Sequence, residues 1–172
     1  ILERVKDVDT VVFDKTGTLT EGEMRLTDVV PLSTAEGPGH TEAAADGGVA
    51  TEVSDPAEPS SSEEALLAAV ATAERGSEHP IAEAVVADAE ERGIALGDPA
   101  TFENVPGKGV RATTDRGEVL VGTRSLLAEA GVDADPAEDV LADLEAAGKT
   151  AMLVAIDGQL AGVVAVADTV KE

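Results

Sequence analysis

The stretch TAMLVAIDGQLAGVVAVAD, residues 150–168, predicts two strands joined by a tight turn. Apolar and β-branched residues run on both sides of Asp157-Gly158, and Asp-Gly is among the strongest short signals for a two-residue hairpin turn. Strands joined by such a turn are antiparallel. We therefore expect an antiparallel sheet at the centre of the fold.

The segments before this hairpin predict further strands and the helices that cover the sheet. Residues 24–30 alternate weakly as a strand, and residues 101–123 contain short strands divided by PGKG and DRG. Helical patterns occupy residues 60–76, 79–93, 124–131 and 136–148. The first opens with capping-box spacing, Ser61 to Glu64, and the second has Pro80 in its first turn and Gly93 as its stop. This order of elements predicts an α+β domain.

Composition limits the partners of the chain and its surroundings. Its 12 basic and 35 acidic residues give a net charge of -23, which argues against binding to nucleic acid or to an anionic membrane surface. We interpret the charge as an adaptation to a salt-rich cytoplasm; the alternative is one acidic face that docks a basic partner. There is no cysteine for a disulfide and no apolar run long enough to span a membrane, so the chain alone is expected to be soluble.

Residues 33–62 predict a disordered acidic insertion. The segment is rich in small and acidic residues and contains no Lys or Arg. Too little apolar surface is available there to offset the entropy of ordering the backbone. We therefore expect no metal-binding role for His40, which lies inside it.

The segment DTVVF, residues 9–13, predicts a buried strand that ends beside Asp14. An isolated Asp at such a place is usually a cap or a turn former. Here, however, residues 14–20 read DKTGTLT, which is the phosphorylation signature of P-type ATPases. The resemblance implies that Asp14 becomes an aspartyl phosphate.

The residues around Asp14 suit that chemistry. A carboxylate and a phosphate that approach to about 4 Å repel by about 4 kcal/mol at an effective dielectric constant near 20. We therefore expect Mg²⁺ to bridge them at Asp14 and Thr16, with Lys15 adding positive charge. Phosphatases of the wider haloacid dehalogenase superfamily usually carry a second Asp where this chain has Thr16. Loss of that base favours a long-lived phosphoenzyme, which suits a pump.

The segment ERGSEHPIAEAV, residues 74–85, resembles the nucleotide-binding domain of heavy-metal-transporting P-type ATPases. A His before a Pro at a helix start is by itself more often structural. The resemblance implies that His79 orients ATP, that Glu74 contacts the adenine amino group, and that Glu78, within the Ser-Glu-His-Pro hallmark, belongs to the nucleotide site.

Two glycine-containing segments complete the implied nucleotide site. In PGKGV, Gly107 and Gly109 match glycines that let the backbone approach the nucleotide, although a hairpin turn explains the pair equally well. In VLVGT, Gly122 is present but Thr123 replaces the usual Asn. The resemblance covers nearly the whole chain outside the insertion, and Asp168 and Lys171 match its Asp-x-x-Lys element.

The resemblance also implies a domain plan and partners. Residues 23–160 are the expected nucleotide-binding domain, and residues 1–22 and 161–172 the adjoining parts of an α/β haloacid-dehalogenase-like phosphorylation domain. ATP and Mg²⁺ are the implied cofactors, and a copper pump is favoured over a zinc or cadmium pump. The expected partners are the membrane helices, the actuator domain and the rest of the phosphorylation domain of the same pump, on the cytoplasmic side of the cell membrane.

Two alternative functions stay open at this point. A stand-alone phosphatase of the same superfamily needs a base at position 16 and magnesium carboxylates after Lys171, and the chain offers neither. A nucleotide-sensing module that performs no catalysis needs only the nucleotide site. Because the later pump motifs do not follow Lys171, we expect a monomeric fragment with little or no activity of its own.

Overall fold

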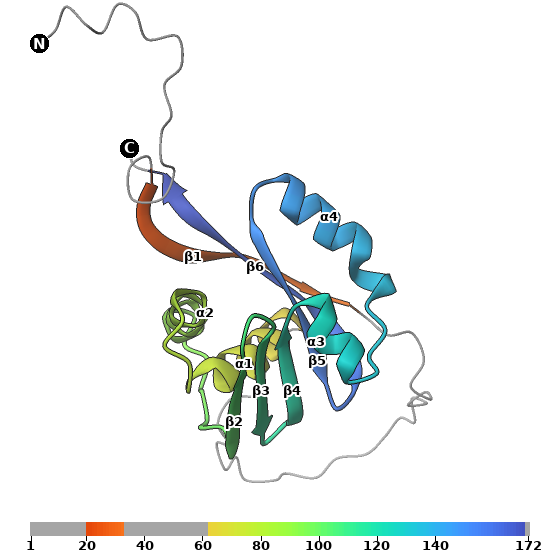
Figure 1. Cartoon of the computed structure of the whole chain (residues 1–172). Coiled ribbons are helices and arrows are strands. Elements are labelled where there is room, and N and C mark those ends of the chain that lie inside the picture. Colours follow the sequence, from red (N-terminus) through yellow and green to blue (C-terminus); the bar gives the residue numbers. More distant parts are fainter. Residues whose placement is uncertain (1–19, 33–61, 171–172) are drawn as a thin grey trace, which may run out of the picture.

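A computed structural model of the chain describes residues 20–32 and 62–170 (Figure 1). In chain order, its elements are β1 (Thr20–Pro31), α1 (Ser62–Glu74), α2 (Pro80–Glu91), β2 (Thr101–Val105), β3 (Gly109–Thr114), β4 (Gly117–Gly122), α3 (Arg124–Glu129), the 3-10 turn η2 (Asp135–Ala137), α4 (Glu138–Ala146), β5 (Thr150–Ile156) and β6 (Gln159–Val170). The helices and strands expected within the described residues are all present.

One six-stranded sheet organises these elements, in the order β1-β6-β5-β4-β3-β2. Every neighbouring pair is antiparallel. β1 and β6, the first and last strands among the described residues, pair with each other, with Thr20 opposite Val170, so the two ends of the described chain lie together (Figure 1). The predicted α+β fold with an antiparallel sheet is confirmed.

The hairpin at Asp157-Gly158 forms as predicted. Both residues have positive φ, 48° and 76°, as a two-residue turn between twisted strands requires. Ile156 and Gln159 pair across the turn. The Asp157 carboxylate accepts a hydrogen bond from the Glu118 backbone N–H at 2.9 Å, which ties the turn to β4.

The sheet separates two hydrophobic cores, because successive residues of a strand point to opposite faces. On the α1–α2 face, the core includes Leu67, Val70, Val85, Val121 and Val154. On the α3–α4 face, it includes Leu120, Leu126, Leu127, Leu141 and Leu153. Adjacent pairs such as Leu120 and Val121 therefore serve different cores, and the molecule has three layers (Figure 1).

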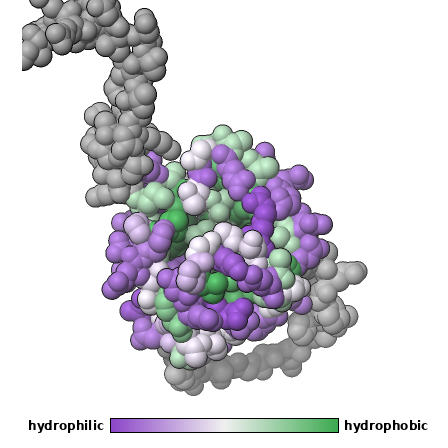
Figure 2. Space-filling model, viewed as in Figure 1, coloured by the Kyte–Doolittle hydropathy of each residue, from purple (hydrophilic) through white to green (hydrophobic). Residues whose placement is uncertain are grey.

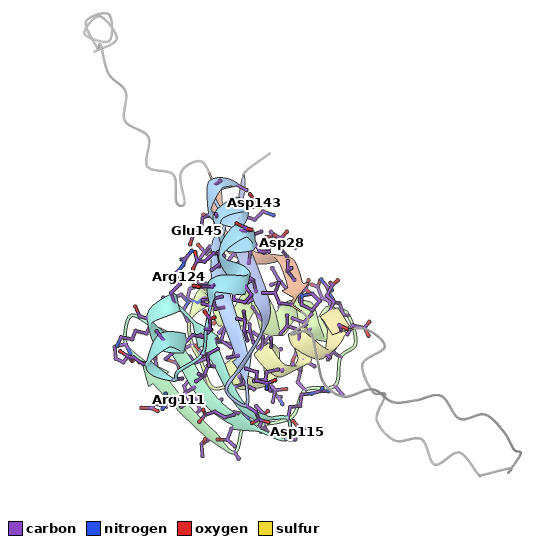
Figure 3. All side chains as sticks on the ribbon, turned by 90° about the vertical axis from the view of Figure 1, so that its right-hand side faces the viewer. Asp28, Arg111, Asp115, Arg124, Asp143 and Glu145 are labelled. Carbon is purple, nitrogen blue, oxygen red and sulfur yellow. The ribbon has the colours of Figure 1, made fainter. Side chains whose placement is uncertain are left out.

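Charged side chains join elements at the surface. Arg124 at the start of α3 donates to Glu138 at 2.7 Å and to Glu145 at 3.2 Å, so one guanidinium links α3 to α4 (Figure 3).

Hydrophilic residues cover much of the face in Figure 2, with hydrophobic patches between them. Among the described helices, none has the length and apolar character needed to cross a membrane.

Some predictions fall outside the described residues. These are the strand at 9–13, the capping residue Ser61 and the insertion up to residue 61. Ser62, predicted as the last residue of the insertion, is the first residue of α1.

Candidate functional site

A cavity of about 340 Å³ lies where α1 ends, α2 begins, and β4 and β5 meet the turn after β2. It brings together five of the residues singled out in the sequence: Glu74, His79, Gly107, Gly109 and Gly122. Apolar side chains of Ile81, Val110, Val121 and Met152 also line it. A largely apolar cavity with a few polar groups is typical of a small-molecule site.

His79 holds a defined orientation at the edge of this cavity. It is the N-cap of α2, and its Nδ1 accepts the Ile81 backbone N–H at 3.2 Å. The N–H groups of a first helical turn lack partners within the helix, so this bond satisfies one of them. Because Nδ1 accepts, the neutral ring carries its proton on Nε2. The exposed ring can therefore donate a hydrogen bond from Nε2 to a ligand.

Glu74, the last residue of α1, is buried, with 5% of its surface exposed. Burial raises the pKa of its carboxyl group to about 7, and a hydrogen bond with the Ser77 side chain opposes that shift. The Ser77 hydroxyl oxygen also accepts the His79 backbone N–H at 3.3 Å. Ser77 thus connects Glu74 to His79 within the lining of the cavity.

Gly109 and Gly122 are required by their own strands. Gly109 has φ of 139° and pairs with Gly122 across β3 and β4. A Cβ on Gly109 would lie 2.1 Å from the Val121 carbonyl oxygen, and one on Gly122 would lie 2.1 Å from the Lys108 carbonyl oxygen. Gly107 is different: its φ is 71°, and a Cβ added there would meet no atom within 4 Å, as in an open turn.

The structure places the other predicted residues as follows. Glu78 is exposed and is not among the residues that line the cavity. Thr123 lines the cavity as the N-cap of α3, and its side chain makes no capping hydrogen bond. Asp168 lies in β6, whereas Asp14, Lys15, Thr16 and Lys171 fall outside the described residues.

Sequence reasoning missed four polar residues of the cavity: Ser77, Asn104, Lys108 and Thr150. Lys108 and Ser77 stand inside the two quoted motifs, PGKGV and ERGSEHPIAEAV, so position within a motif could have identified them. Asn104 and Thr150 join the cavity only through the pairing of the sheet, which no local pattern reveals.

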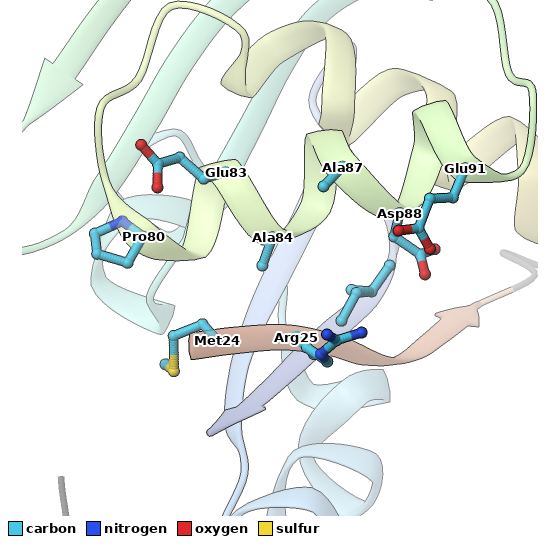
Figure 4. Close-up of a pocket in the computed structure, with 9 residues that line it drawn as sticks. Met24, Arg25, Pro80, Glu83, Ala84, Ala87, Asp88 and Glu91 are labelled. Carbon is cyan, nitrogen blue, oxygen red and sulfur yellow. The ribbon is translucent and has the colours of Figure 1, made fainter. Parts of the chain in front are cut away.

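A second cavity, of about 500 Å³, lies between β1 and α2 (Figure 4). Its lining includes Glu83, Asp88 and Glu91 of α2 and Met24 and Arg25 of β1. Carboxylates repel an anionic ligand, so this groove suits a nucleotide less well than the His79 cavity. The described residues contain no group of three or more His, Cys, Asp or Glu that could hold a metal ion.

Comparison with known proteins identifies the class of protein to which the chain belongs. Residues 8–172 match the family model described as haloacid dehalogenase-like hydrolase, and the chain belongs to this family. Within that family, its sequence and fold are similar to the nucleotide-binding region of P-type ATPases, as the following relatives show.

Two curated relatives match almost the whole chain. A copper-transporting P-type ATPase of Rhizobium leguminosarum bv. viciae is 42% identical over 170 residues, which cover 99% of this chain and 17% of that protein. A copper-exporting P-type ATPase of Bacillus subtilis (strain 168) is 39% identical over 171 residues, which cover 99% of this chain and 18% of that protein. The chain therefore spans less than a fifth of the relatives it matches.

Solved structures show the same likeness. A zinc-transporting PIB-type ATPase in the E2.Pi state has a TM-score of 0.69 at 28% identity, covering 99% of this chain and 23% of that one. The N-domain of HMA6, a copper-transporting P-type ATPase, has a TM-score of 0.57 at 20% identity, covering 84% of this chain and 99% of that domain. The second match shows the fold, and it confirms the sheet and helices expected for a nucleotide-binding domain.

Proposed function

We propose that this chain binds ATP in the His79 cavity and presents it to Asp14 within a copper-transporting pump. The observation that carries the proposal is convergence: Glu74 and His79, from the segment at 74–85, line one cavity with Gly107, which lies in PGKGV more than 25 residues later. Copper is the cargo named for the two curated relatives, whose whole length far exceeds this chain.

The cavity offers different groups to the parts of a nucleotide. Its apolar residues, such as Val121 and Met152, suit the faces of an adenine ring. An ionised Glu74 accepts a hydrogen bond from the exocyclic amino group of adenine, and Nε2 of His79 donates one. The N-terminal turn of α2 also borders the cavity through Ile81 and Ala82, and its partial positive charge favours an anionic ligand.

Phosphoryl transfer is proposed for the segment around Asp14. Carboxylate and hydroxyl oxygens, as Asp14 and Thr16 provide, are ligands that Mg²⁺ accepts, and Mg²⁺ supplies charge neutralisation when bound. The domain boundaries after residues 22 and 160 are part of the same proposal; β6 continues through the second of them. Thr16 supplies no carboxylate base, which disfavours the stand-alone phosphatase.

Titration of ATP by calorimetry or NMR tests the site. His79→Ala should weaken binding about tenfold, because it removes a donor to the ligand and the cap of α2. The matched control is His40→Ala, which changes the other histidine of the chain and should leave the affinity unchanged. Equal affinities of the native chain and His79→Ala would remove His79 from the site.

The same titration in low and in molar salt tests the proposed adaptation to a salt-rich cytoplasm. The net charge of -23 repels ATP at long range, and salt screens that repulsion. We expect tighter binding in molar salt. Weaker binding there would contradict the adaptation and leave the site itself standing.

A further inference from the structure

We propose that Lys108 binds the phosphate chain of the nucleotide and that Glu129 competes with the nucleotide for its ammonium group. This inference rests on the proposed nucleotide binding in the His79 cavity. It assigns phosphate binding to Lys108, the residue between the two glycines of PGKGV. It also assigns a regulating role to the carboxylate of Glu129 on α3.

Lys108 is the one Lys or Arg among the described residues that line the cavity. The other ionisable groups in that lining are Glu74 and His79. In a chain of net charge -23, a phosphate chain needs a nearby cation to offset repulsion from the many carboxylates. The Lys108 ammonium is therefore the group best suited to the anionic end of the ligand.

The backbone of Lys108 is fixed while its side chain can move. Its N–H donates to the Val105 carbonyl at 3.0 Å, and its carbonyl accepts the Thr123 N–H at 2.8 Å. The flanking glycines hold positive φ values of 71° and 139°, which set the course of the turn. The side chain beyond this anchored backbone is long and flexible.

The Lys108 ammonium forms an ion pair with the Glu129 carboxylate at the end of α3. Glu129 does not line the cavity, so the pair lies at its edge. The two side chains are 36% and 55% exposed, and an ion pair this exposed contributes little to stability. A phosphate chain carries more negative charge than one carboxylate, so exchange of partners is favourable when a nucleotide is bound.

Binding of ATP and of adenosine, measured side by side by calorimetry, tests the inference. Lys108→Gln should weaken ATP binding about tenfold and leave adenosine binding unchanged, because only ATP carries phosphates. Lys108→Arg keeps the charge and should restore most of the ATP affinity. Glu129→Gln removes the competitor and should tighten ATP binding about threefold, again without effect on adenosine.

The matched control is Lys149→Gln, which removes another paired lysine, joined to Asp28 at 2.6 Å outside the cavity. It should change neither affinity. NMR amide spectra of each variant, compared with the native chain, report that the fold is kept.

The outcomes separate this inference from the proposed function. Unchanged ATP affinity in Lys108→Gln, or an equal loss for ATP and adenosine, overturns the role of Lys108 while nucleotide binding stands. Unchanged ATP affinity in Glu129→Gln overturns the competition. If the native chain binds neither ATP nor adenosine, the proposed function fails, and this inference fails with it.

Discussion

The two faces of the sheet pack in the same way but differ in where their charged side chains lie. Each packs a pair of helices on fully buried aliphatic side chains. The α1–α2 face buries a carboxyl group, Glu74, which is the one buried charged residue among those described. The α3–α4 face keeps its charges near the surface, where Arg124 and Lys149 pair with carboxylates. A protein retains a buried ionisable group at a cost, and such groups concentrate at functional sites.

That difference indicates a division of labour between the faces. The α1–α2 face contributes Glu74 and His79 to the cavity, while the α3–α4 face supplies packing. Its link to the cavity is the start of α3, through Thr123, and the ion pair of Glu129. Core variants on either face should therefore lower stability, but only those on the α1–α2 face should also weaken ATP binding.

The largest effect is expected from matched core truncations, Leu67→Ala in α1 and Leu127→Ala in α3. Both leucines are fully buried, at 0% exposure, so each change should lower the free energy of unfolding by about 3 to 4 kcal/mol. Denaturant unfolding measures that loss. Only Leu67→Ala should also weaken ATP binding to the folded protein, because α1 positions Glu74.

Equal weakening of ATP binding by both truncations would contradict the division of labour between the faces. The cavity would then depend on the whole sheet and not on the α1–α2 face. Binding is measured well below the unfolding midpoint of each variant, so that loss of folded protein does not imitate loss of affinity.

Local signals made much of this fold predictable from sequence. Asp157-Gly158 specifies its turn through two residues that tolerate positive φ, and His79-Pro80 specifies the start of α2. Both signals lie within a few neighbouring residues. The extent of β1 was less well predicted. The expected strand began at residue 24, whereas β1 begins at Thr20, which pairs with Val170 of β6.

The chemistry of the candidate site was less accessible to sequence, because it depends on distances between segments. The burial that raises the pKa of Glu74 comes from packing around the end of α1. The pair Lys108–Glu129 joins a turn to a helix 21 residues later. Gly109 was expected to let the backbone approach a nucleotide, and the structure shows that Gly109 and Gly122 first let β3 and β4 approach each other.

A smaller effect, and one that depends on pH, is expected for Glu74→Gln on the α1–α2 face. The folded chain holds the proton of Glu74 up to a pKa of about 7, whereas the ordinary value is 4.5. Its contribution to stability is therefore complete below pH 4.5 and is lost as the pH rises through 7. The shift corresponds to about 3 kcal/mol in the free energy of unfolding.

Gln is neutral throughout, so the variant should gain stability relative to the native chain as the pH rises. Denaturant unfolding of both proteins at several pH values gives the difference, in which the titration of other groups cancels. Glu91→Gln, at an exposed position of α2, is the control and should show no such trend. A difference that does not vary with pH would mean that Glu74 does not titrate as a buried acid.

The smallest effect, with the opposite dependence on pH, is expected for Lys149→Met on the α3–α4 face. The Lys149 ammonium lies 2.6 Å from Asp28, and this hydrogen bond holds the pKa of Asp28 below its ordinary 3.8. Both side chains are 27% exposed, so the variant should lose about 1 kcal/mol of unfolding free energy at neutral pH. The loss should vanish as the pH falls through the lowered pKa of Asp28, because protonation removes the charge that Lys149 pairs with. Unfolding curves that keep the same difference in acid would show that Lys149 stabilises the fold by packing its side chain, and the two faces would then no longer differ in how they respond to pH.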